Sequence, residues 1–322
     1  MQPDLIYDVG MNNGDDTAYY LFKGYRVVAV DADPTLIDAA RSRFAAEIAA
    51  GRLTLLNVGI GPDEGIAKFY ICEGKSEWNS FDVAIASRLG PNYHAIDVPC
   101  RRFRNILGQH GVPLYLKIDI EGHDHYCLAD LDPAELPKYA SVEMTRLEDL
   151  IALRDLGYNA FKIVTQTDFS QLRPEPSLAE SAGQRRVSNP GFHSCLTRAA
   201  VSPAWLGQLL ESLRPAQIGQ WLRRRLAPYP RVYDVARNFA ALKRRLGDPL
   251  QRRPAAGDAP VGNVAPAWAF PSGSSGPFGE ETDGTWQTFE EAAYAWLHYR
   301  LGYSKYGRRS LNFWHDVHAT KV

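Results

Sequence analysis

The sequence predicts an α/β fold in which a mostly parallel sheet carries helices on both faces. Short apolar runs alternate with helical patterns through residues 5–165, which is typical of a parallel sheet with right-handed crossovers. The run at 26–31 is apolar along nearly its whole length, as expected of a strand buried on both faces. A loop with two glycines follows the first run, where such sheets bind nucleotide cofactors.

The predicted elements of the first half follow one another through short connections. Acids at Asp15 and Asp16 favour a helix start there, and Pro34 suits a first helical position. We expect strands at 5–9, 26–31, 52–57, 114–120, 140–144 and 159–165, and an added strand at 67–72. We expect helices at 15–23, at 34–50, after 122, and at 146–156.

The second half of the chain has a different composition. Residues 203–247 have an amphipathic helical pattern, and residues 254–286 are rich in Gly, Pro, Ser and Ala, which indicates a long loop. A helical pattern returns at 287–301, and residues 311–319 are compatible with a final strand.

The overall composition is that of an ordinary globular protein, with 45% hydrophobic and 23% charged residues among 322. The net charge of −1 leads us to expect no nucleic-acid partner. The four cysteines form no CxxC pair, so we expect reduced thiols rather than a zinc finger. No secretion signal and no apolar run of ~20 residues is visible, so we expect a cytoplasmic protein.

One segment departs from this neutral balance. Residues 198–253 contain twelve basic and three acidic residues, with basic triplets at 223–225 and 243–245. Basic amphipathic helices can lie on an anionic membrane or bind polyanions. Peripheral contact with an anionic membrane or an acidic glycan is one interpretation, and a solvated basic face offset by acids elsewhere is the other.

Three features at the expected strand ends predict a cofactor site. The loop 8–14 reads DVGMNNG, Asp31 ends the second strand 21 residues after Gly10, and 57–59 follow the third strand. The carboxylate of Asp31 can accept hydrogen bonds from both ribose hydroxyls of a cofactor. The edge of an adenine ring can pack against residues 57–59. The predicted cofactor-binding residues are Asp8, Gly10, Asn12, Asn13, Gly14, Asp31, Asn57, Val58 and Asp119.

The acids of this loop favour one kind of cofactor. The loop has a GxxxG spacing rather than the GxGxxG of dinucleotide-binding enzymes. Asp8, Asp15 and Asp16 would repel a pyrophosphate but suit a cationic cofactor with an amino-acid tail. The loop therefore favours S-adenosylmethionine, and an NAD-dependent oxidoreductase is the alternative.

The segment 116–124, LKIDIEGHD, resembles the K-I-D-x-E-G-x-E hallmark of the FkbM family of methyltransferases. The segments 8–14 and 28–34 are similar to further motifs of that family, and the resemblance covers about residues 4–165. It implies a class I methyltransferase (Rossmann-like) fold with a seven-stranded sheet, and transfer of a methyl group to a hydroxyl oxygen. Arg104 stands where the family usually has Asp, so a non-catalytic binding protein on this fold is a further alternative.

The resemblance also implies a division of the chain. The seventh strand should be antiparallel beside the sixth, and residues 313–319 are the candidate. We expect a cofactor-binding core at 1–170 and a basic helical and Gly/Pro-rich insertion at 171–285, which would form a cap or a partner surface. A C-terminal helix and strand at 286–322 would complete the core.

Four polar residues near the expected cofactor cleft are the catalytic candidates. They are Asp119, Glu121, His123 and Glu143. A hydroxyl acceptor must lose its proton to a base or with the help of a metal. Asp119, Glu121 or His123 is the base in one mechanism. In the other, Asp119 and Glu143, with or without His123, hold Mg²⁺, which prefers oxygen ligands.

The acceptor itself is expected to be a small molecule or a glycan. Aromatic residues of the second half can stack on a sugar or simply pack in the core. They are Trp268, Phe270, Phe278 and Trp286. In the final strand, Asp316 and His318 should share one face, and they reach the acceptor only if that strand borders the cleft.

Overall fold

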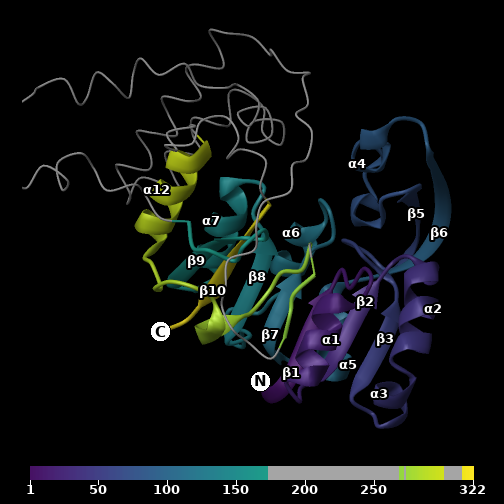
Figure 1. Ribbon diagram of the computed structural model, residues 1–322, viewed down its shortest axis with the longest axis horizontal. Helices are drawn as coiled ribbons and strands as arrows, with labels where there is room; N and C mark the ends of the chain where they lie inside the picture. Colours follow the sequence, from purple (N-terminus) through teal and green to yellow (C-terminus); the bar gives the residue numbers. More distant parts are fainter. Residues whose placement is uncertain (173–267, 272, 301–313) are drawn as a thin grey trace, which may run out of the picture.

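The computed structural model describes residues 1–172, 268–271, 273–300 and 314–322. Seven strands form one sheet in the order β3-β2-β1-β7-β8-β10-β9, and β10 is antiparallel to both its neighbours. This sheet runs through the centre of Figure 1, with helices on both sides. The strands are β1 Gln2–Val9, β2 Arg26–Asp31, β3 Leu53–Asn57, β7 Pro113–Ile118, β8 Tyr139–Glu143, β9 Ala160–Thr165 and β10 His315–Thr320. The mostly parallel seven-stranded sheet is confirmed, including its antiparallel last strand.

The helices that flank this sheet follow the predicted order, except that α5 was not predicted. They are α1 Asp15–Phe22, α2 Pro34–Arg43, α3 Ala45–Ala49, α5 Phe103–His110, α6 Asp124–Ala129, α7 Leu147–Leu156 and α12 Phe289–Arg300. The helix expected at 34–50 is broken at Phe44, whose φ of −111° is not helical. The Phe44 ring is buried and lies against Gly14 of the cofactor-type loop. The break therefore turns an apolar side chain toward the core.

The strand predicted at 67–72 belongs to a second sheet rather than to the main one. Its strands β4 Gly59–Ile60, β5 Gly65–Cys72 and β6 Tyr93–Arg101 pair in the order β4-β6-β5. This small sheet and α4 Val83–Ala86 lie beyond the β2–β3 side of the main sheet (Figure 1). Strand β6 was not among the predicted strands.

Two cores cover the two faces of the main sheet. In β1, Leu5, Tyr7 and Val9 belong to one core, and Ile6 belongs to the other. Successive side chains of a strand point to opposite faces, so an unbroken apolar run serves both cores. Helix α7 covers the first core through Leu150, among others.

The described part of the predicted insertion packs against the second core. Phe278 stacks on Tyr115 with 4.3 Å between ring centroids and an interplanar angle of 4°. The side-chain hydroxyl of Ser274 donates a hydrogen bond to Asp16 of α1. The basic segment 198–253, the helical pattern at 203–247 and Phe313 lie outside the described residues. The cap or partner surface therefore stays a prediction.

Among the described residues, the helices are all too short or too polar to cross a bilayer.

Gly10 lies where the loop after β1 passes very close to the backbone of Asp119, which leaves no room for a side chain. It has φ of +85°, and a Cβ atom added there would lie 1.7 Å from the Asp119 carbonyl oxygen. We predict that Gly10→Ala lowers the free energy of unfolding by about 2–4 kcal/mol, combining backbone strain and overpacking. Urea denaturation measures this loss.

Gly24→Ala is the matched control, because Gly24 has φ of +91° but no atom within 4 Å of the added Cβ. It should lose only about 1–2 kcal/mol from backbone strain. Equal losses in the two variants would show that the clash between the added Cβ atom and the Asp119 carbonyl does not contribute to the loss of stability.

Candidate functional site

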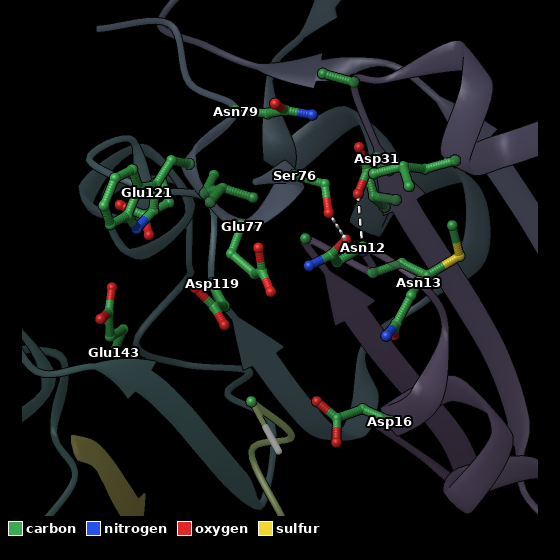
Figure 2. Close-up of a pocket in the computed structure, with 18 of the residues that line it drawn as sticks. Asn12, Asn13, Asp16, Asp31, Ser76, Glu77, Asn79, Asp119, Glu121 and Glu143 are labelled. Atoms are coloured by element: carbon green, nitrogen blue, oxygen red, sulfur yellow. Dashed lines mark hydrogen bonds between the residues drawn. The ribbon is translucent and has the colours of Figure 1, made fainter. Parts of the chain in front are cut away.

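A pocket of about 350 Å³ lies at the carboxyl ends of β1, β2, β7 and β8. Its wall includes the loop 10–13, Asp31, Val58, Asp119, Glu121 and Glu143. A segment between β5 and β6, residues 75–79, also lines the pocket. Figure 2 shows Asp31 and Asn13 toward one end of the pocket and Glu121 and Glu143 toward the other. We call these the Asp31 end and the carboxylate end.

The loop after β1 is attached to the end of β2. The Gly10 amide donates to the Val30 carbonyl at 2.9 Å, and the Asn12 amide donates to Asp31 Oδ2 at 2.8 Å (Figure 2). Asn12 has φ of +49°, a conformation that asparagine tolerates better than most residues. Burial raises the pKa of Asp31 to about 7, although the two backbone amides it accepts from oppose that rise. Asp31 is therefore a fixed carboxylate in the pocket wall.

Three of the predicted cofactor-binding residues lie behind the wall instead of in it. Asp8 is fully buried, and Gly14 packs against Phe44. The side-chain amide of Asn57 donates to the backbone carbonyls of Asp31 and Ala32 at 3.0 and 3.1 Å. Asp8, Gly14 and Asn57 therefore support the residues that line the pocket, and their direct contact with the cofactor stays a prediction.

Asp8 belongs to a buried ion group centred on Lys117. The Lys117 ammonium donates to Asp8 Oδ1 at 2.9 Å and to the Gly10 carbonyl at 3.0 Å, and lies 3.4 Å from Asp16 Oδ2. Burial alone would lower the pKa of Lys117, but Asp8 and Asp16 outweigh it and hold the pKa well above its usual value. Lys117 therefore stays charged and holds the cofactor-type loop by its backbone.

Three carboxylates meet at the other end of the pocket. Asp119 and Glu121 follow β7, and Glu143 ends β8. Burial raises the pKa of Asp119 to about 6 despite the attraction of Lys117. Burial and repulsion by Asp119 raise the pKa of Glu121 to about 8, and the same causes raise the pKa of Glu143 well above its usual value. Shifts of this kind are typical of groups that exchange protons during catalysis.

Glu121 is held in an uncommon conformation. Its φ is +43°, which side-chain-bearing residues rarely adopt. The Ser80 hydroxyl donates to its carbonyl at 2.7 Å, and Arg88 Nη1 lies 3.4 Å from its carboxylate. The turn before α6 is capped by Asp124, which accepts from the amides of Ile120 and Gly122. Glu121 is thus directed to the pocket rather than used as a helix cap.

His123, the fourth catalytic candidate, lies outside the pocket wall. Its ring stacks on Phe81 with 4.6 Å between centroids and an interplanar angle of 13°. Its Nδ1 lies 3.0 Å from the Ile60 carbonyl, which can only accept a hydrogen bond. His123 therefore donates from Nδ1 and fastens the site loop to the second sheet.

Sequence reasoning missed one wall of the pocket. The pocket-lining residues that were missed are Lys75, Ser76, Glu77, Trp78, Asn79, Gln166, Ser274 and Trp314. Ser76 donates to the Asn12 side chain at 2.9 Å, and Asn79 donates to Asp33 at 2.9 Å. The sequence shows a polar loop at 76–80, but no local signal indicates that it folds over the cofactor-type loop.

The metal interpretation has no geometric support among the described residues, where no group of three or more His, Cys, Asp or Glu side chains is placed to hold an ion.

Asp316 pairs with Glu143 across β10 and β8, and it accepts a hydrogen bond from Gln166 at 2.9 Å. Asp316 and His318 are both buried and lie outside the pocket wall.

The strand order, the antiparallel last strand and the pocket at the carboxyl ends of the parallel strands define a class I methyltransferase fold. Residues 8–172 match the model of the methyltransferase FkbM domain, and the chain belongs to this family. Membership implies the use of S-adenosylmethionine.

Two further comparisons are more limited. Over 52 residues the chain is 44% identical to the probable ribosomal RNA small subunit methyltransferase A of Methanospirillum hungatei JF-1, which is 16% of this chain and 20% of that protein. The chain thus spans about one-fifth of the length of this curated relative. The crystal structure of precorrin-6y C5,15-methyltransferase from Geobacter metallireducens GS-15 aligns with a TM-score of 0.29 and 17% identity, over 52% of this chain and 71% of that one.

The buried ion group predicts a large stability effect. Lys117→Met leaves the Asp8 and Asp16 carboxylates buried without their cation, so we expect a loss of about 3–5 kcal/mol in the free energy of unfolding. Lys68→Met is the control, because its ion pair with Asp97 is exposed and should contribute only about 0–1 kcal/mol. Denaturant titration compares the two, and similar losses would contradict the importance of the Lys117 group.

Proposed function

We propose that this methyltransferase transfers the methyl group of S-adenosylmethionine to a hydroxyl oxygen of a small-molecule or carbohydrate acceptor. The observation that carries the proposal is the meeting of Asp119, Glu121 and Glu143 at one end of the pocket. When bound, S-adenosylmethionine supplies a methyl group on a good leaving group. The protein must then place the acceptor oxygen and take its proton.

The residues of the pocket fit this cofactor. Asp31 presents carboxylate oxygens suited to a ribose diol, and the apolar side chains of Leu36 and Val58 lie in the same wall for an adenine ring. Asp16 and Asp119 make the pocket acidic, which suits a sulfonium cation and opposes a pyrophosphate. The negative charge of the pocket disfavours the NAD alternative, because NAD carries a pyrophosphate that these acids would repel.

Glu121 is our proposed general base. A base works best when its pKa is near the working pH, and the pKa of Glu121 is raised to about 8. Its uncommon backbone conformation and the hydrogen bond from Ser80 to its carbonyl fix the backbone that carries this carboxylate beside the pocket. Asp119 and Glu143 then orient the acceptor hydroxyl through hydrogen bonds.

The Asp31 assignment predicts a loss of cofactor affinity. Asp31→Ala removes hydrogen bonds from the ribose to a carboxylate, so calorimetry should show affinity for S-adenosylhomocysteine about tenfold to a hundredfold weaker. Wild-type protein should give no heat with NAD. Asp38→Ala, at an exposed acid of α2, is the control and should bind normally. A folded Asp31→Ala protein with wild-type affinity would remove the ribose assignment.

The base assignment predicts a specific pH dependence. A carboxylate base works only when deprotonated, so kcat/KM should rise with pH and level off above about 8. Glu121→Gln should lower kcat by about 10²–10⁴-fold and abolish this rising limb. A variant that retained the limb would assign the proton transfer to another group.

Two controls accompany this measurement. Glu73→Gln changes an exposed glutamate outside the pocket wall and should keep the wild-type profile. Turnover in EDTA should equal turnover without it. A loss that Mg²⁺ alone restores would favour the alternative in which Asp119 and Glu143 hold the ion.

A further inference from the structure

Two tryptophans lie at the carboxylate end of the pocket. Trp78 lies close to Arg88, whose guanidinium is 5.7 Å from the Trp78 ring centroid and 3.4 Å from the Glu121 carboxylate. Trp314 immediately precedes β10, which pairs with β8 at Glu143, and its carbonyl accepts a hydrogen bond from the Gln166 amide. Both rings line the pocket, and Trp314 is 47% exposed. The two indoles therefore flank the carboxylates rather than Asp31.

A lysine lies between these two rings. Lys75 Nζ is 4.4 Å from the Trp78 ring centroid and 4.8 Å from the Trp314 centroid. Cation–π attraction of this kind holds an ammonium in place without neutralising it. Lys75 has no ion-pair partner within the described ranges, and its positive charge acts on the pKa of Glu121. The pocket thus has a positioned cation at the end where its acids would otherwise repel an anion.

The remaining polar groups at this end suit a ligand with several hydroxyls. Glu77 and Gln166 line the wall beside the tryptophans. Indole faces pack well against the apolar face of a sugar ring, and carboxylate and amide groups bind its hydroxyls. An ammonium binds a carboxylate or phosphate through charge-assisted hydrogen bonds. Each kind of group on such a ligand therefore has a partner here.

We propose that Trp78, Lys75 and Trp314 form the acceptor subsite, and that this subsite selects a sugar that carries a carboxylate or a phosphate. The proposal rests on the methyl-transfer function proposed above. The target hydroxyl lies at Glu121, and the anionic group of the same acceptor lies at Lys75. The four aromatics expected from the sequence are not needed for this role. Among them Phe278 is buried in the core, and Trp286 stacks on Tyr139.

A printed glycan array tests the proposal with the full-length protein and saturating S-adenosylhomocysteine. The array carries neutral sugars, carboxylate-bearing sugars and phosphate-bearing sugars. We expect binding to the anionic sugars to be at least about tenfold tighter than to their neutral counterparts. The carboxylate and phosphate arms show which anion is preferred.

Two variants separate the roles of Lys75 and Trp314. Lys75→Met should remove at least about tenfold in affinity for anionic sugars and leave neutral sugars unchanged, whereas Trp314→Ala should weaken both. Lys68→Met and Phe22→Ala are the matched controls, because each changes an exposed side chain of the same kind outside the pocket wall. They should bind glycans like the wild type.

Each contrary result has a defined meaning. Equal binding of neutral and anionic sugars, or no glycan binding at all, would overturn the subsite. Loss of S-adenosylhomocysteine affinity in Lys75→Met, measured by calorimetry, would assign Lys75 to the cofactor and also overturn it. If the best-bound glycan shows the expected variant effects but accepts no radiolabelled methyl group, the transfer function fails and the subsite stands.

Discussion

The buried contact of Lys117 with Asp8 and Asp16 is the interaction on which the rest of the site depends. It joins β7, β1 and α1, and through the bond between Ser274 and Asp16 it also holds the returning chain. Burying a charge is costly unless it is paired and hydrogen-bonded. Only an arrangement that satisfies all of these groups keeps the cation in place, and that arrangement fixes the Gly10 carbonyl and the loop after it.

The proposed anionic acceptor and the cationic cofactor would place two different electrostatic requirements on one cavity. Its acids suit a cationic cofactor, but the same acids would repel an anionic acceptor. The segment 75–79 lies between two strands of the second sheet and brings Lys75 to the carboxylate end, where Lys75 would offset this repulsion for the proposed anionic acceptor. The second sheet is therefore part of the site, and His123 connects it to the loop that carries Glu121.

The sequence was most informative where the signal was local. Apolar runs predicted the strands of the main sheet, and the segments at 8–14 and 116–124 predicted the loops that line the pocket. It was least informative where a role depends on distant partners. Asp8 is adjacent to a cofactor loop but pairs with Lys117, 109 positions away. Trp314 lines the pocket only because β10 returns to the sheet, and no pattern within either segment encodes that contact.

The place of β10 within the sheet has a consequence for how the protein is made. β10 fills the space between β8 and β9, yet Asp316 and its partner Gln166 are 150 positions apart. During synthesis, β8 and β9 are complete long before the strand that joins them leaves the ribosome. Their facing edges then have unmet backbone hydrogen bonds, and closing so long a loop is slow. The nascent chain therefore passes through a stage in which these edges can pair with strands of other chains, and the arrival of β10 between β8 and β9 ends that stage.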